Sequence, residues 1–91
     1  MKIVLNKCYG GFGLSDRALS LYNKKAKTNI SWARDIDRSD PVLIKVVEML
    51  GEEVNTRFSE LKIVEIPDGV DWEITEYDGI EQVAEKHRSW G

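Results

Sequence analysis

The hydrophobic pattern begins with a short apolar run, Ile3-Val4-Leu5, which predicts a buried strand. A glycine-rich bend follows at Gly10-Gly11-Phe12-Gly13. Apolar residues then recur at close to helical spacing and predict a helix from Asp16 to about Lys27, with Ser15 as its N-cap. A strand, a bend and a helix start in succession place exposed backbone N–H groups at one point, which makes the bend a candidate ligand site.

The middle of the chain has weaker signals before a second helix. Residues Asn29 to Asp37 alternate weakly and predict a short strand or an extended connection. Asp40-Pro41 predicts the start of the second helix, because aspartate is a good N-cap and proline suits the first helical position. Apolar residues keep the helical period to about Asn55, and Gly51 either lies inside this helix or ends it.

The C-terminal part predicts strands. Leu61 to Ile66 is a strand that stops at the turn cluster Pro67-Asp68-Gly69. Trp72 to Tyr77 alternates with a period of two, and Asp78-Gly79 is typical of a tight hairpin turn. Ile80 to Trp90 fits either a capped helix or the second hairpin strand. We favour the strand, because Trp72 to Tyr77 needs a neighbour and the Asp-Gly turn supplies one.

These elements predict a single α+β domain over residues 1–91. We expect a small mixed sheet of four to five strands, with a C-terminal β-hairpin, packed against two helices. The chain has 42% hydrophobic and 32% charged residues, which is typical of a globular protein. It contains no apolar run long enough for a membrane helix and no recognisable signal peptide, so we expect a cytoplasmic protein without a membrane partner. A net charge of −3 argues against general nucleic-acid binding.

The hairpin interpretation fixes which side chains share a face. A two-residue turn pairs Glu76 with Glu81, and such like charges repel unless a cation lies between them. Lys7, Arg38 or a positive group of a ligand could supply that cation, whereas on a solvent-facing rim the repulsion would be screened. The same face would carry the following residues: Trp72, Ile74, Glu76, Glu81, Val83, Glu85 and His87.

The glycine bend matches neither standard phosphate loop. It lacks the lysine of a Walker loop, and Asp16 stands where a dinucleotide fingerprint has its third glycine. Tyr9 and Phe12 beside the glycines could stack on a base, or could belong to the core. The segment His87-Arg88-Ser89-Trp90 combines groups that bind anions and stack on rings, although it could equally be a chain end with an aromatic anchor.

No constellation in the chain predicts catalysis or a cofactor. Cys8 is the single cysteine, and no motif pairs it with His87, the single histidine, so we expect a buried thiol at a strand end. One histidine with Glu81 and Glu85 is a poor match to metal-ligand spacings. We therefore expect neither an enzyme nor a metal site.

Four segments together resemble a family of small, uncharacterised proteins encoded by bacteriophages and prophages. These segments are NKCYGGFGLS, DIDRSDP, LKIVEIP and WEITEYDGIEQVAEKHRSW, and they extend over most of the chain. The resemblance implies a phage protein expressed in a bacterial cytoplasm, and it supplies no catalytic residues.

The sequence therefore leads to a first hypothesis, a binding protein without turnover that sequesters a nucleotide-derived signal of host defence. Backbone N–H groups and arginine would bind phosphates, and aromatic rings would stack on the base. We expect a homo-oligomer, because one small domain has little concave surface. The candidate ligand-binding residues are Tyr9, Gly10, Gly11, Phe12, Gly13, Ser15, Arg38, His87, Arg88 and Trp90.

A second hypothesis is an acidic inhibitor module that masks a basic surface on a host enzyme. The carboxylates that support it gather toward the C-terminal half: Glu65, Asp68, Asp71, Glu73, Glu76, Glu81 and Glu85. A small enzyme ranks last, because the sequence shows no paired nucleophile and base.

Overall fold

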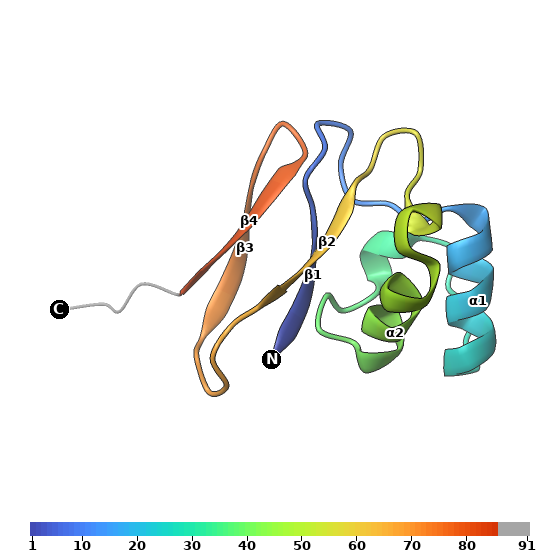
Figure 1. Cartoon of the computed structure of the whole chain (residues 1–91), viewed down its shortest axis with the longest axis horizontal. Helices are drawn as coiled ribbons and strands as arrows, with labels where there is room; N and C mark the ends of the chain where they lie inside the picture. Colours follow the sequence, from blue (N-terminus) through green and yellow to red (C-terminus); the bar gives the residue numbers. More distant parts are fainter. Residues whose placement is uncertain (86–91) are drawn as a thin grey trace, which may run out of the picture.

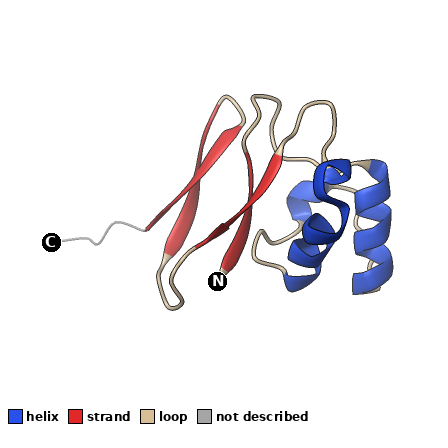
Figure 2. Cartoon of the chain, in the orientation of Figure 1, coloured by secondary structure: helices blue, strands red, loops and turns tan. Residues whose placement is uncertain are grey.

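The structure is a computed structural model, and it describes residues 1–85. These residues form an α+β fold in which two helices lie at one end of the molecule and a β-hairpin at the other (Figures 1 and 2). No helix within residues 1–85 has the length and apolar character needed to cross a membrane. The elements in chain order are β1 (Lys2–Asn6), α1 (Asp16–Ala26), η1 (Ala33–Asp35), α2 (Pro41–Leu50), η2 (Gly51–Val54), β2 (Leu61–Glu65), β3 (Trp72–Tyr77) and β4 (Ile80–Glu85).

The four strands form two antiparallel pairs. β1 pairs with β2 in a register that places Val4 opposite Ile63, and β3 pairs with β4 so that Glu76 lies opposite Glu81. The predicted α+β class, the C-terminal hairpin and its register are therefore confirmed, with the strands divided between two sheets of two strands each. The favoured strand over residues 80–90 is confirmed from Ile80 to Glu85, and the remainder of that prediction lies outside the described residues.

Helix α1 has the predicted start and a well-defined end. Ser15 is its N-cap, and the Ser15 hydroxyl accepts a hydrogen bond of 3.1 Å from the backbone N–H of Ala18. Lys27 ends the helix in the left-handed conformation, with φ 57°, and its N–H donates to the carbonyl of Asn23. Local capping chemistry therefore sets both boundaries.

Helix α2 starts as predicted but ends earlier than the hydrophobic period indicated. The carboxylate of Asp40 accepts from the N–H of Val42 at 2.8 Å, and Pro41 occupies the first turn. The α-helix stops at Leu50 because Gly51 adopts φ 57°, so the alternative in which Gly51 ends the helix is confirmed and the α-helix does not continue to Asn55. The chain continues as the 3-10 helix η2, which keeps Val54 buried.

Residues 29–37 form an extended connection and the short 3-10 helix η1 (Ala33–Asp35), and not a strand. The Asn23 side chain pairs with both backbone groups of Ile30: its Nδ2 donates to the Ile30 carbonyl at 2.8 Å, and its Oδ1 accepts from the Ile30 N–H at 2.9 Å. A side chain from α1 thus satisfies the groups that a neighbouring strand would have used. Trp32 is 63% exposed, whereas Ile36 is buried.

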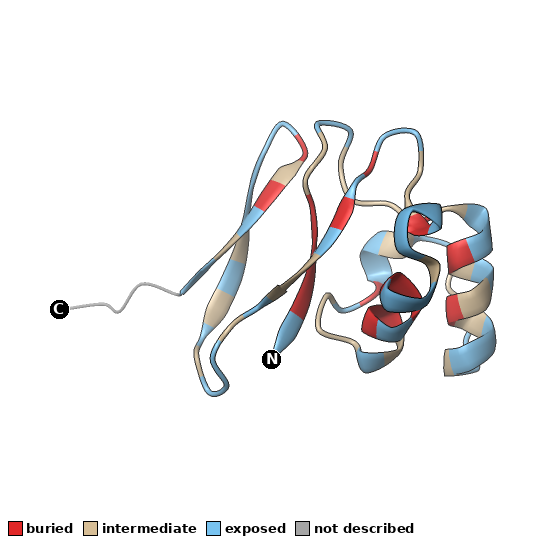
Figure 3. Ribbon diagram, in the orientation of Figure 1, coloured by how far each residue is buried: buried red, intermediate tan, exposed pale blue. Residues whose placement is uncertain are grey.

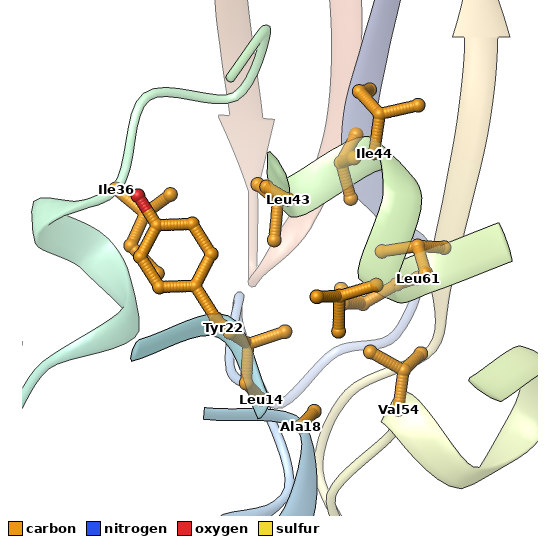
Figure 4. Packing of buried hydrophobic residues seen from close by; sticks show 11 residues of the cluster. Leu14, Ala18, Tyr22, Ile36, Leu43, Ile44, Val54 and Leu61 are labelled. Atoms are coloured by element: carbon orange, nitrogen blue, oxygen red, sulfur yellow. The ribbon is translucent and has the colours of Figure 1, made fainter. Parts of the chain in front are cut away.

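The main core lies between the helices and the β1–β2 sheet (Figures 3 and 4). Val4 is its contribution from β1, and Leu61 is its buried contribution from β2. At the edge of this core the hydroxyl of Tyr22 donates to the Asp40 carboxylate at 2.6 Å, which joins α1 to the cap of α2. The cluster comprises Val4, Leu14, Ala18, Tyr22, Ile36, Leu43, Ile44, Val46, Val47, Val54 and Leu61.

The face of β1 that points away from the helices is also buried, and the hairpin lies on that side. Ile3 and Leu5 alternate with Val4, so their side chains point away from the helices, yet they are 0% and 1% exposed. The hairpin face that carries the buried Glu81 also carries half-buried apolar residues, including Ile74 and Val83. β1 is therefore the central element of the molecule, with apolar contacts on both faces.

We predict that Tyr22 makes the fold sensitive to alkaline pH. Burial, followed by the hydrogen bond to Asp40, raises the pKa of Tyr22 to about 12 from an ordinary value of 10.0. Above pH 10 the unfolded phenol ionises while the folded phenol stays protonated, so the free energy of unfolding should fall between pH 10 and 12.

The measurement is urea unfolding across that pH range. Tyr22→Phe should flatten the decline and should lower stability at neutral pH by about 1 kcal/mol for the lost hydrogen bond. Tyr9→Phe, which removes the hydroxyl of an exposed tyrosine, is the matched control. Parallel declines for the wild type and Tyr22→Phe would contradict the prediction.

Candidate functional site

Three loops meet at one end of the molecule, which we call the loop end. It comprises residues 8–13 after β1, residues 56–60 before β2 and residues 76–79 around the hairpin turn (Figure 1). The glycine bend singled out in the sequence belongs to the first of these loops. The loop end is therefore the candidate functional site.

The hairpin turn packs its backbone directly on the glycine bend. Asp78 and Gly79 have φ values of 50° and 91°, which fits the type I′ turn that an Asp-Gly pair favours. A Cβ atom on Gly79 would collide with the carbonyl oxygen of Tyr9 and would lie 2.6 Å from the backbone nitrogen of Gly11. Glycine is thus required at position 79 for close approach as well as for its conformation.

The bend also packs closely on the loop before β2. A Cβ atom on Gly10 would collide with the Cβ and carbonyl oxygen of Phe58. The N–H of Gly11 donates to the carbonyl of Cys8 at 3.4 Å, which closes a turn inside the bend. Contacts within the protein therefore require glycine at position 10, and a φ of 98° favours glycine at position 11.

Asn6, the last residue of β1, connects the three loops. Its Nδ2 donates to the carbonyls of Cys8 and Gly79, each at 2.7 Å, and its Oδ1 accepts from the N–H of Glu60 at 2.9 Å. Asn6 is fully buried. Sequence reasoning missed this residue, although an asparagine that ends an apolar strand just before a glycine loop is a usable signal, because its amide can bond to loop backbone.

A buried ion pair lies beside the loop end, between Arg38 and Glu81. The Nη2 atom of Arg38 donates to Glu81 Oε2 at 2.7 Å, and Nη1 donates to Glu81 Oε1. The side chains are only 16% and 8% exposed. Glu81 Oε1 also accepts from the N–H of Asn6 at 2.8 Å, so the carboxylate is bonded to the strand as well as to the guanidinium.

A cation compensates Glu81, which is one of the two alternatives that its pairing with Glu76 left open. Arg38 supplies the charge, and Lys7 Nζ donates to the backbone carbonyl of Glu81 at 2.8 Å. Glu76 turns elsewhere, and its Oε1 accepts from the N–H of Gly79 at 2.7 Å. Glu76 and Glu81 are therefore paired across the hairpin, but their carboxylates have different partners.

The segment that presents Arg38 is fixed on both sides. The N–H of Val4 donates to the Arg38 carbonyl at 2.9 Å, and the guanidinium lies 3.6 Å from the centre of the Phe12 ring. The N–H and hydroxyl of Ser39 donate to the Asp37 carboxylate, and these bonds hold the pKa of Asp37 below its ordinary value. Arg38 is thus a structural cation with its donors directed inward.

The predicted ligand-binding residues fall into separate groups. Ser15 caps α1 and donates to the carbonyl of Glu53, and Phe12 lies under Arg38. The Gly13 carbonyl accepts from the Ser59 hydroxyl at 3.0 Å. His87, Arg88 and Trp90 lie outside the described residues, and the described chain ends at the far end of β4 from the hairpin turn (Figure 1).

The remaining three predicted residues line a shallow hollow at the loop end. Its volume is about 520 Å³, and the residues around it are Tyr9, Gly10, Gly11, Glu76, Asp78 and Gly79. Two carboxylates line this hollow, and none of its lining residues within the described part of the chain is Lys or Arg. The charge of the hollow therefore favours a cation over a phosphate.

The described residues hold no cluster of three or more His, Cys, Asp or Glu side chains placed to bind a metal ion. Cys8 is half-buried at the end of β1. Comparison with known proteins gives no match: no family model fits the chain, and no curated protein or solved structure is significantly similar to it. The resemblance to phage proteins stays a prediction.

We predict that either single loss in the Arg38–Glu81 pair lowers stability strongly. Arg38→Met or Glu81→Gln leaves the remaining buried group without its charged partner, which should cost about 3–5 kcal/mol in urea unfolding. Arg17→Met is the matched control, because Arg17 pairs with Glu53 at 3.1 Å on the exposed surface and its loss should cost less than about 1 kcal/mol. Equal losses for Arg38→Met and Arg17→Met would contradict this assignment.

We predict that Gly79→Ala destabilises the protein more than Gly69→Ala. Both glycines have positive φ values, 91° and 79°, so alanine is strained at either position by about 1–2 kcal/mol. Only at Gly79 does a new Cβ collide with the backbone, whereas at Gly69 it meets open space. Urea unfolding should show an additional loss of about 1–3 kcal/mol for Gly79→Ala, and equal losses would mean that the turn does not pack on the bend.

Proposed function

We propose that this chain is a binding protein without turnover, and that its acidic hairpin segment, residues 66–85, covers a basic surface of a partner protein. One observation carries the proposal. The segment contains seven Asp and Glu residues and no Lys or Arg, and six of the seven are exposed: Asp68, Asp71, Glu73, Glu76, Asp78 and Glu85.

The charge is separated along the molecule. Because the whole chain has a net charge of −3 and the hairpin segment −7, the other residues together carry +4. The hairpin lies at the opposite end from α1, whose last turn carries Lys24 and Lys25 (Figure 1). A field of one sign at one end steers a cationic partner to that end and accelerates association.

The shape of the hairpin also suits contact with a protein surface. Its outward face is exposed at Glu73, Thr75 and Gln82, and Tyr77 on that face is 77% exposed. Its inward face is fixed by the Arg38–Glu81 pair. A rigid strand pair that presents carboxylates and an exposed tyrosine fits a protein surface better than a small ligand.

Nucleotide sequestration ranks second. The hollow beside Tyr9 and the glycine bend supports it, because a base could stack on that ring. The carboxylates of Glu76 and Asp78 and the inward direction of the Arg38 donors weigh against a phosphate at this position. If the phage resemblance holds, the partner of either kind belongs to the infected bacterium.

We predict that binding to a basic partner depends on where the carboxylates lie. A partner retained from a bacterial lysate is identified and purified, and its affinity is then measured by calorimetry at several salt concentrations. Asp71→Asn/Glu73→Gln/Glu85→Gln should weaken binding by about tenfold, since each exposed pair contributes about 0.5 kcal/mol. Added salt should weaken wild-type binding as well.

The matched control is Asp16→Asn/Asp35→Asn/Glu52→Gln, which changes the net charge equally on the helical side and should leave affinity within about twofold of the wild type. Equal losses for the two triple variants would show that only net charge matters. A thermal-shift panel of nucleotides tests the second hypothesis, because a bound ligand raises apparent stability by mass action. A clear shift with one nucleotide, without binding to any basic protein, would overturn the proposal.

A further inference from the structure

We propose that Tyr9 and Phe58 form an aromatic anchor that enters an apolar pocket on the partner protein, and that Lys or Arg residues rim this pocket. This proposal rests on the proposed function, because it names the chemistry of the surface that the acidic hairpin meets. It is carried by the exposure of the two side chains, by the backbone packing of the loops that hold them, and by the carboxylates beside Tyr9.

The two aromatic residues are exposed on adjoining loops. Tyr9 is 71% exposed and Phe58 is 62% exposed. Their loops are in contact, because the backbone of Phe58 closes against Gly10, the residue after Tyr9. Large aromatic residues that stay exposed on loops in contact mark interaction sites more often than residues scattered singly over the surface do.

The loops that carry the rings are held firmly. The N–H of Phe58 donates to the hydroxyl of Thr56 at 3.1 Å, and the Ser59 hydroxyl donates to the Gly13 carbonyl at 3.0 Å. The N–H of Lys7 donates to the Glu60 carbonyl at 2.7 Å. The backbone under both rings is therefore ordered before binding, which reduces the entropy lost in a complex.

The surroundings of Tyr9 define the charge of the partner. Tyr9 lines the 520 Å³ hollow together with Glu76 and Asp78. Glu76 uses Oε1 to accept from Gly79, which leaves Oε2 without a hydrogen bond within residues 1–85. An ammonium or guanidinium group is attracted by carboxylates and also by the face of an aromatic ring. Two carboxylates beside Tyr9 therefore favour a cationic group on the partner. The partner pocket should therefore have cationic residues at its rim.

Two synthetic peptides of equal positive charge test this directly. The first carries Lys and Arg around a central Leu-Leu pair, and the second has Ser-Ser in place of Leu-Leu. We expect the wild type to bind the leucine peptide at least tenfold more tightly by calorimetry, with NMR shift changes concentrated at the loop end. Tyr9→Ser/Phe58→Ser should remove this preference and keep the weaker binding of the serine peptide.

Trp32→Ser is the matched control, because Trp32 is an equally exposed aromatic residue, at 63%, on a different loop. It should keep the preference, and all variants should retain the wild-type unfolding midpoint, because these side chains are exposed. An equal affinity for both peptides, or a preference that survives Tyr9→Ser/Phe58→Ser, would overturn the anchor.

The outcomes separate the anchor from the function on which it rests. If both peptides bind equally and Asp71→Asn/Glu73→Gln/Glu85→Gln weakens both, the acidic hairpin stands and the anchor is wrong. If neither peptide binds, both proposals are overturned.

Discussion

The buried pair between Arg38 and Glu81 is the interaction on which the arrangement of this protein depends. The even-numbered residues of β1 direct their backbone groups away from β2, and these groups would form an open sheet edge. Arg38 covers that edge at Val4 through its carbonyl and guanidinium, and the Glu81 carboxylate covers it at Asn6. One backbone carbonyl and two side chains thus take the place of a third strand, and the Arg38–Glu81 pair attaches the hairpin to the rest of the fold.

A hairpin of two strands is marginally stable alone, and the five acidic residues between Trp72 and Glu85 repel one another. A buried ion pair is costly to desolvate, so its value here lies in specificity more than in net stability. A shift of one residue in the register of β4 would place Gln82 where Glu81 meets Arg38, and would turn the half-buried Val83 outward. The pair therefore selects one register of the hairpin.

Local signals in the sequence were sufficient for the helix starts, the hairpin turn and its register, because caps and Asp-Gly turns act through neighbouring residues. The same signals could not give the end of α2, where the conformation of Gly51 overrides a hydrophobic period that continues to Val54. Nor could they exclude a strand after α1, because the Asn23 side chain that satisfies Ile30 acts across a loop. Contacts between distant segments, such as Asn6 with Gly79, carry no local pattern at all.

The candidate site shows the same limit, because the glycines that predicted a ligand loop have another explanation in the structure. Glycines after a strand indicated exposed amides for an anion, but Gly10 and Gly79 are required because other backbone atoms lie where a side chain would be. Arg38 was chosen as a phosphate ligand, and its donors bind Glu81 and Val4 within the protein. What the bend offers to a partner is therefore the residues that its close packing leaves exposed. Tyr9 is the principal one, and its neighbours are carboxylates, so a cationic surface is the partner that this chemistry favours.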